Sequence, residues 1–169
     1  MEGPIISELS LDKVSIEDVM IKDVKYLKNT ATIGEAVDAF TEYRVGGFPI
    51  VDENKKVVAF LSDGDIIHYI LYRAGAQGII FFKHWSDMDV EALEKAANAV
   101  ANESVMNCAT RNVRAAEYND NLREVAQYMD RKKLKNMPVV RDGELVGVIS
   151  RNTLIKNFFM KYAKLGVQA

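Results

Sequence analysis

An acidic residue stands three positions after a serine, at the point where an apolar strand is predicted to end. Ser62 and Asp65 follow the run 57–61 and form the pattern S-x-x-D. An ionised carboxylate in this place can accept charge-assisted hydrogen bonds from two hydroxyl groups, and such bonds are the stronger kind. The same spacing is a helix cap, in which Ser62 accepts from the backbone and Asp65 favours the helix N-terminus. The two roles are compatible, so Asp65 is the first candidate binding residue.

The same spacing occurs near the C-terminus, where Thr153 stands three positions after Ser150 and Arg151 follows the serine. Thr153 has a single hydroxyl and no charge. Hydrogen bonds to charged groups contribute ~1.5–3 kcal/mol against ~0.5–1.5 kcal/mol for neutral ones. We therefore expect this second position to bind a ligand more weakly, by about tenfold, or to stay empty.

The elements around these two positions form an internal repeat. Two predicted helices carry apolar residues at spacing 0, 3, 4, 7, each after a cap, Thr32 with Glu35 and Asn121 with Glu124. Two predicted hairpins follow, at 48–61 and 137–149, the second around the turn pair Asp142-Gly143. Pro49 lies 89 residues before Pro138, and Ser62 lies 88 before Ser150. One residue lost from the second hairpin loop explains the change of offset.

The repeat predicts an α+β fold in which two β-α-β-β-α repeats pack as a pseudo-twofold pair, because each half alone is too small to bury both its helices and its sheet. The predicted organisation is an N-terminal segment (1–13), repeat 1 (14–72), a helical linker (73–102), repeat 2 (103–162) and a C-terminal tail (163–169). Within the linker, residues 88–101 predict a helix that bridges the halves or covers an interface. We expect Trp85, just before it, to be buried in packing.

Composition excludes several classes of function. A net charge of −2 and a pI near 5.8 give no basic surface for nonspecific nucleic-acid binding. Cys108 is the only cysteine, so no intrachain disulfide can form. The N-terminus lacks a signal-peptide pattern, and no apolar run is long enough to span a membrane. We expect a cytoplasmic protein without nucleic-acid or membrane partners.

Motifs for catalysis are missing. His68 and His84 have no acid or cysteine at a recognisable spacing, so neither zinc nor acid–base chemistry is indicated and no metal site is predicted. Cys108 lacks a C-x-x-C partner, which favours a half-buried apolar role. Ser62 lacks the G-x-S-x-G turn of a hydrolase, and no P-loop occurs. We predict that the protein is not an enzyme.

The order of these motifs resembles the CBS (cystathionine β-synthase-type) domain, in tandem as in the CBS pair or Bateman module. The order is Val-Met, short strand, helix, G-x-P-[IV]-V-D, hairpin, S-x-x-D and helix, and it occurs twice. The second copy departs at Arg141, where the first has Asp52, and at Thr153, where the first has Asp65. The resemblance covers residues 14–72 and 103–162.

The resemblance implies that adenosine nucleotides bind between the repeats. The ribose would meet S-x-x-D of one repeat, and the base would lie against the first strand and the G-x-P approach of the other. The first implied site comprises Ser62, Asp65, Val113, Arg114, Lys135, Asn136 and Pro138. The second comprises Val24, Lys25, Gly46, Gly47, Pro49, Ser150, Arg151 and Thr153.

Two observations bear on which site is used, and they disagree. The charge of Asp65 favours the first site, whereas Gly46-Gly47 leaves more room for a base in the second than Lys135-Asn136 does in the first. Lys135 closes a basic run, 131–135, that suits a helix C-terminus, yet it could also reach a phosphate; Arg151 is a weaker phosphate candidate. We favour the first site.

The implied function is a regulatory module that senses AMP, ADP, ATP or a related adenosyl ligand without turning it over and requires no cofactor. We expect a homodimer and allow for an unknown effector protein as partner. The alternative is a ligand-free scaffold for dimerisation or interaction, which Thr153 and the bulky Lys135-Asn136 favour.

Overall fold

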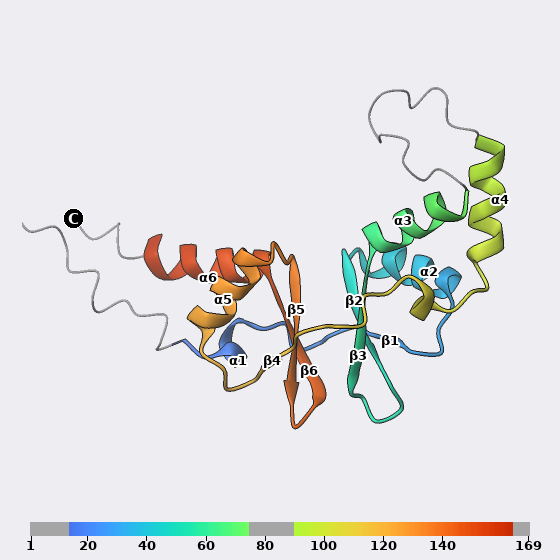
Figure 1. Cartoon of the computed structure of the whole chain (residues 1–169). Coiled ribbons are helices and arrows are strands. Elements are labelled where there is room, and N and C mark those ends of the chain that lie inside the picture. The colour runs from blue at the N-terminus through green and yellow to red at the C-terminus, as the bar shows by residue number, and fades with distance from the viewer. Residues whose placement is uncertain (1–13, 75–89, 164–169) are drawn as a thin grey trace, which may run out of the picture. The chain divides into compact units, whose positions relative to one another are not determined.

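The computed structural model describes residues 14–74 and 90–163, and it shows a mixed α+β protein with two three-stranded sheets (Figure 1). The chain divides into two compact units. The continuous unit is residues 25–113, and the split unit combines the residues up to 24 with those from 114 onward. His84, Trp85, the segment 1–13 and most of the tail lie outside the described residues.

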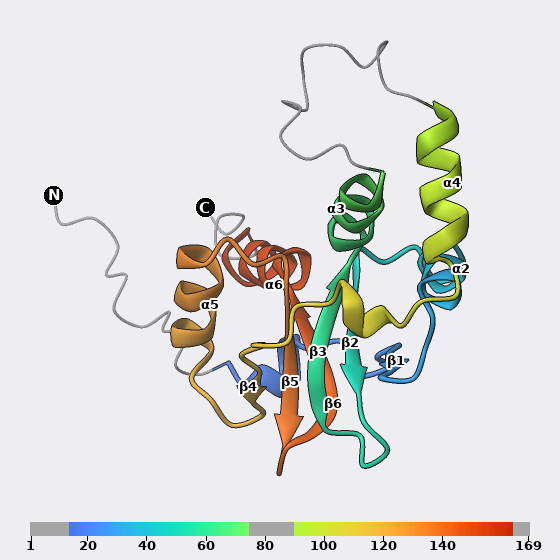
Figure 2. The same cartoon turned by 45° about the vertical axis from the view of Figure 1, so that its right-hand side comes forward.

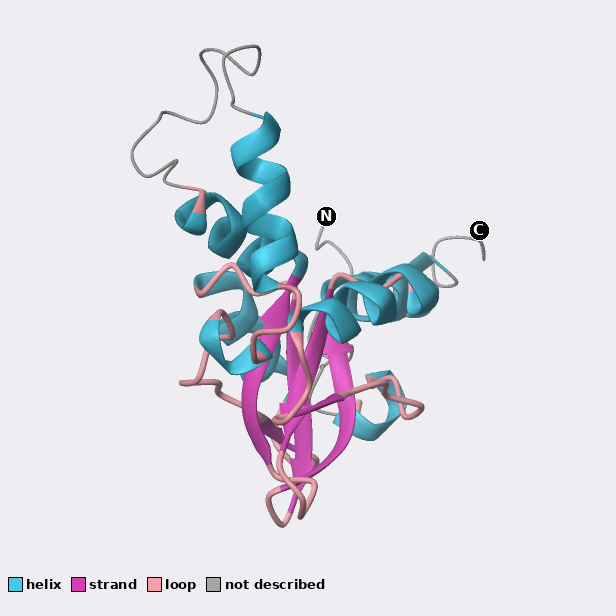
Figure 3. Cartoon of the chain, turned by 90° about the vertical axis from the view of Figure 1, so that its right-hand side faces the viewer, coloured by secondary structure: helices cyan, strands magenta, loops and turns pink. Residues whose placement is uncertain are grey.

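Among the described residues, the continuous unit holds seven elements: β1 (Leu27–Lys28), α2 (Ile33–Tyr43), β2 (Gly47–Val51), β3 (Val57–Ser62), α3 (Asp63–Arg73), α4 (Val90–Val100) and the short 3-10 helix η4 (Val105–Asn107). The described part of the split unit holds six: α1 (Ile16–Val19), β4 (Ala116–Glu117), α5 (Leu122–Arg131), β5 (Asn136–Arg141), β6 (Glu144–Ser150) and α6 (Arg151–Ala163). In each unit the first strand is parallel to the second, and the second is antiparallel to the third. Each hairpin runs directly into a helix (Figure 3).

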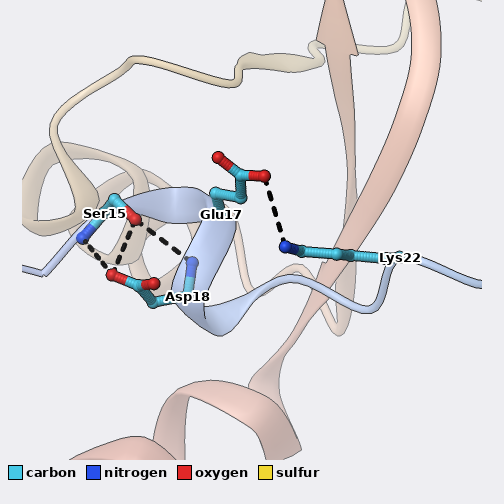
Figure 4. A network of polar contacts seen from close by, with 4 residues as sticks. All are labelled: Ser15, Glu17, Asp18 and Lys22. Carbon is cyan, nitrogen blue, oxygen red and sulfur yellow. Dashed lines mark hydrogen bonds and ion pairs between the residues drawn. The ribbon is translucent and has the colours of Figure 1, made fainter.

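Capping boxes begin helices α1, α2 and α3. In α1 the Ser15 hydroxyl accepts from Asp18 N at 3.2 Å, and the Asp18 carboxylate accepts from Ser15 N at 3.3 Å (Figure 4). Thr32 and Glu35 form the same box on α2. Each box satisfies two backbone donors that a helix start leaves open. Helix α2 ends before Gly46-Gly47, because Arg44 adopts the left-handed conformation with φ 51°.

One edge strand of each sheet, β3 or β6, pairs at a single residue with a segment from the other sequence repeat. In the split unit, Ile21 pairs with Val148 of β6 through two backbone hydrogen bonds, of 2.9 and 3.1 Å. In the continuous unit, Thr110 pairs with Phe60 of β3 through two bonds of 2.9 Å. The compact units therefore differ from the sequence repeats, since the start of each repeat packs with the hairpin of the other.

The exchanged segments also complete the apolar cores. Ile16 and Val19 are 0% and 3% exposed, and they pack in one cluster with residues of α5, β5 and β6. Val105, which is 0% exposed, packs with residues of α2, β2 and β3. Gly147 on β6 makes room for this exchange, because a Cβ there would collide with the Met20 side chain.

Helix α4 lies alongside α3 (Figures 1 and 2) and within the range 88–101 that the sequence predicts. The segment after it caps α2: Gly34 N and Ile33 N donate to the carbonyls of Ala101 and Glu103, both at 2.8 Å. Val100 is 1% exposed in the core of the continuous unit. The end of the linker is thus an integral part of this unit.

We expect the fragment 25–113 to fold alone and the sequence repeat 14–72 to remain unfolded. The fragment contains the whole core cluster of the continuous unit, whereas 14–72 lacks Val100 and Val105 and exposes Ile16 and Val19. Burial of such side chains contributes roughly 1.5–3 kcal/mol each, which is a large part of the stability of a small domain. Urea unfolding followed by circular dichroism should be cooperative for 25–113 only. Cooperative unfolding of 14–72 would contradict the conclusion that each hairpin needs the segment from the other repeat to complete its core.

Candidate functional site

The predicted S-x-x-D pattern caps α3. Ser62 is the N-cap, and its hydroxyl accepts from Asp65 N at 3.2 Å. Oδ2 of Asp65 accepts from Ser62 N at 2.8 Å and from the Ser62 hydroxyl at 2.7 Å. Among the described residues, Oδ1 of Asp65 has no hydrogen-bond partner. The Asp65 side chain is half-buried and is therefore still accessible to a ligand. Asp65 can hold the cap with one oxygen and accept a hydrogen bond from a ligand with the other.

The glycine pair lies beside this cap, in the same unit. Gly47 is paired with Ser62 across β2 and β3, and Asp63 N donates to the Gly46 carbonyl at 3.5 Å. The space above Gly47 is filled, because a Cβ there would be 2.5 Å from Cε1 of Phe60. Gly46 faces open space. The room that the sequence suggests at this pair therefore exists at Gly46 and is taken by the Phe60 ring at Gly47.

The exchanged segment of the continuous unit, which includes Cys108 and Thr110, also lies near the α3 cap. Thr110 pairs with Phe60, two residues before Ser62, and Cys108 lies two residues before Thr110. Burial raises the pKa of the Cys108 thiol to about 11, and the Asp65 carboxylate contributes to the same direction. Sequence reasoning missed this neighbour of Asp65. The available signal was the 89-residue offset between Ile21 and Thr110, the two residues that form the exchanged pairs.

The C-terminal half of α3 forms hydrogen bonds and an ion pair with the start of the same segment, at Glu103. Tyr69 donates to Oε2 of Glu103 at 2.7 Å, Asn107 donates to that oxygen at 3.1 Å, and Arg73 forms an ion pair with Oε1. These hydrogen bonds, that of Tyr69 first, lower the pKa of Glu103. The residues from Glu103 to Thr110 therefore contact α3 near its C-terminus and β3 just before the cap.

The corresponding cap in the split unit is saturated. The Thr153 hydroxyl donates to the Ser150 carbonyl at 2.9 Å, and it accepts from Ser150 N at 3.1 Å and from the Ser150 hydroxyl at 3.3 Å. A threonine hydroxyl has one donor and two acceptor positions. All three are used inside the cap, so Thr153 has no hydrogen bond left for a ligand.

Arg151 and Lys135 are joined through the loop between α5 and β5. Arg151 N donates to the Lys135 carbonyl at 2.8 Å, and Nη2 of Arg151 donates to the carbonyls of Lys133 and Leu134, each at 3.1 Å. The Lys135 side chain is exposed, and among the described residues no ion pair engages it. Asn136 is half-buried and pairs with Ser150 across the strands.

The remaining candidates lie on or beside the first strands of the units. Arg114 stacks over the Tyr128 ring at 4.3 Å, and Lys25 lies over the Tyr43 ring at 5.7 Å. Such contacts fix the direction of a cation. Pro49 and Pro138 are buried within β2 and β5.

The structure assigns the predicted residues to units as follows. Of the first site, Ser62, Asp65 and Val113 belong to the continuous unit, and Arg114, Lys135, Asn136 and Pro138 to the split unit. Of the second site, Lys25, Gly46, Gly47 and Pro49 belong to the continuous unit, and Val24, Ser150, Arg151 and Thr153 to the split unit.

Two further findings concern metal binding and membrane crossing in the part of the chain that the structure describes. No three or more His, Cys, Asp or Glu side chains gather there in a way that could hold a metal ion. None of the described helices is long and apolar enough to cross a membrane.

The fold and the two caps define a class: a protein of two related α+β repeats, each with a hairpin that leads into a capped helix. A family model for the CBS domain matches residues 16–72 and 104–159. The two matches cover most of the chain, which therefore belongs to the CBS domain family.

Two relatives show the level of sequence similarity. The uncharacterized protein MJ1225 of Methanocaldococcus jannaschii is 28% identical over 141 residues, which are 83% of this chain and 41% of MJ1225. The chloroplastic CBS domain-containing protein CBSX1 of Arabidopsis thaliana is also 28% identical over 141 residues, 80% of this chain and 59% of CBSX1. The chain thus spans about half the length of these relatives.

Solved structures share the fold. CBSX2, solved in complex with AMP, has a TM-score of 0.66 and 20% identity, with 88% of this chain and 98% of that chain covered. The CBS domain pair of MJ0100, solved with 5′-methylthioadenosine and S-adenosyl-L-methionine, has a TM-score of 0.63 and 21% identity, with 88% and 98% covered.

We expect Cys108 to react with iodoacetamide only at high pH in the folded protein. The thiolate is the reactive form, and a pKa of about 11 leaves roughly one thiol in a thousand ionised at pH 8. Asp65→Asn removes a negative charge that opposes ionisation, so the pH profile should shift to lower pH. Because Cys108 is the only cysteine, mass spectrometry of the labelled chain reports this position alone.

The control is the chain unfolded in urea, in which the thiol should titrate near its ordinary pKa of about 8.5. A folded protein that labels with the unfolded profile would contradict the placement of Cys108. An Asp65→Asn profile identical to that of the wild type would contradict its proximity to Asp65.

Proposed function

We propose that the protein binds an adenosine-containing ligand through the ribose hydroxyls at Asp65 and acts as a non-catalytic regulatory module. The observation that supports this most is that only one of the two carboxylate oxygens of Asp65 is used in the helix cap. Oδ2 holds the helix cap, and Oδ1 stays available as a charged acceptor beside the helix N-terminus. A charged acceptor is suited to a ribose diol, as it is in dinucleotide-binding folds.

The ligands of related structures support the choice of the diol. AMP, 5′-methylthioadenosine and S-adenosyl-L-methionine occur in the structures of CBSX2 and MJ0100. All three have an adenine base and a ribose with both 2′- and 3′-hydroxyls, and they differ in the 5′ substituent. A site whose main polar group is Asp65 would recognise the part that they share.

The other assignments remain predictions of the resemblance. These are the base and phosphate contacts of Val113, Arg114, Lys135, Asn136 and Pro138, the homodimer and a separate effector protein. A regulatory role needs a conformational equilibrium that the ligand shifts, and the ligand can shift it only by its difference in affinity for the two states.

Asp65→Asn should weaken adenosyl-ligand binding by at least tenfold, and Asp65→Ala should abolish it. The asparagine retains an oxygen for the cap but loses the charge, and each charged hydrogen bond exceeds a neutral one by about 1 kcal/mol. Calorimetric titration of the wild type with AMP, ATP and S-adenosylmethionine provides the reference affinities.

The matched control is Glu35→Gln, which makes the same change at the third position of another capping box in the continuous unit. It should leave ligand affinity unchanged. Equal affinity of wild type and Asp65→Asn would remove Asp65 from the site. A wild type that binds none of the ligands and shows no thermal shift with them would favour the ligand-free scaffold.

Removal of one ribose hydroxyl should weaken binding by about tenfold, because one charged hydrogen bond is lost. Competition of AMP with 2′-deoxyadenosine and 3′-deoxyadenosine monophosphates measures this. In Asp65→Asn the penalty for the deoxy ligands should shrink. A deoxy ligand that binds the wild type as tightly as AMP would show that the carboxylate does not hold the diol.

A further inference from the structure

We infer that a polar clasp on α3 couples ligand binding at Asp65 to the docking of helix α4. The clasp consists of Tyr69 and Arg73 on α3, Glu103 just after α4, and Asn107. This inference rests on the proposed function and adds the element of the chain that responds to the ligand.

The clasp joins α3 to the segment that follows α4. Oε2 of Glu103 accepts from the Tyr69 hydroxyl at 2.7 Å and from Nδ2 of Asn107 at 3.1 Å. Its Oε1 forms an ion pair with Arg73, which also donates to the Tyr69 hydroxyl at 3.2 Å. Both oxygens of one carboxylate are therefore engaged, so the loss of its charge weakens every contact that Glu103 makes in the clasp.

Asp65 lies on the same face of α3 as the clasp. Asp65, Tyr69 and Arg73 follow one another at a spacing of four residues, which places them along one side of the helix. The segment from Glu103 to Thr110 contacts the C-terminal half of α3 through Glu103, and the Cys108 thiol lies close enough to Asp65 to feel its charge. A ligand on Asp65 therefore binds beside the segment that the clasp holds.

Helix α4, which lies alongside α3 (Figures 1 and 2), is docked through the same residue. Glu103 N donates to the carbonyl of Val100, the last residue of α4, at 2.9 Å. The Glu103 carbonyl accepts from Ile33 N, at the start of α2, at 2.8 Å. Ala96 and Val100 bury the inner side of α4, at 8% and 1% exposed. A change in the hold on Glu103 thus acts directly on the C-terminus of α4.

The clasp belongs to the continuous unit alone among the described residues. The residue equivalent to Glu103, 89 positions earlier, is Val14, and the residue equivalent to Tyr69, 88 positions later, is Asn157. Val14 has no charge and packs against the core of the split unit. Arg73, α4 and Glu103 fall between the two matches to the family model. The fold of a repeat therefore does not require such a clasp.

Hydrogen exchange of the whole chain, followed by mass spectrometry, tests the coupling. AMP, ATP and S-adenosylmethionine are each added at about ten times their dissociation constants. A bound ligand should slow exchange in α4 of the wild type by about fivefold or more, because a ligand stabilises a docked state by its difference in affinity for the docked and undocked states. In Glu103→Gln the same ligand should bind and slow exchange in β2, but the slowing in α4 should disappear. A merely structural role of Glu103 would raise exchange in α4 equally with and without ligand.

Two further variants define the outcome. Glu91→Gln removes an exposed ion pair with Lys95 on α4 itself, leaves the clasp intact and should keep the wild-type slowing. Arg73→Gln breaks the clasp from the side of α3 and should lose the slowing, as Glu103→Gln does. Ligand binding without slower exchange in α4 of the wild type would overturn the inference and leave the proposed function intact, as would a slowing that survives in both clasp variants. A wild type that binds none of the three ligands would refute the proposed function, and the inference with it.

Discussion

The structure depends on the pairing of each hairpin with a segment from the other sequence repeat. β3 and β6 would otherwise present an open row of backbone donors and acceptors, which is costly when buried and a hazard when exposed. Thr110 and Ile21 each satisfy one residue of such an edge with two hydrogen bonds. The apolar residues just before them, Val105 and Val19, enter the core of the same unit. In each unit, one short segment thus pairs with a residue of the edge strand and fills part of the core.

This exchange also determines the surroundings of Asp65. Asp65 lies at the start of α3, and the segment from Glu103 to Thr110 is bound near both ends of that helix.

The caps show how a binding site can arise without loss of folding stability. An acidic residue in the first turn of a helix is favourable whether or not a ligand is present, because it faces the positive end of the helix dipole. Asp65 therefore needs no rearrangement of the cap to accept a hydrogen bond with its second oxygen.

Local elements were predictable because their signals are local. The cap residues Thr32, Ser62 and Asn121 begin helices as expected, and Asp142-Gly143 forms the hairpin turn with φ of 55° and 83°. The bounds of the first strand, Leu27–Lys28, are not predictable from the sequence, since two residues leave no periodic pattern. The exchange was not predicted, because each bridge is one residue pair and has no pattern of its own. At the site, the spare oxygen of Asp65 and the Phe60 ring over Gly47 depend on side-chain directions, which spacing alone does not contain.

Family membership determines less about the site than about the fold. Both repeats keep what the fold needs: a cap at the start of the last helix, a proline in the middle strand and a hairpin beside it. Thr153 fulfils the capping role as completely as Asp65 does, so selection for the fold alone does not distinguish them. What distinguishes them is hydrogen-bonding capacity beyond the cap, which the helix does not use. Glu35 has the same unused oxygen at the start of α2, so this capacity marks Asp65 as a candidate only together with the S-x-x-D motif of the family.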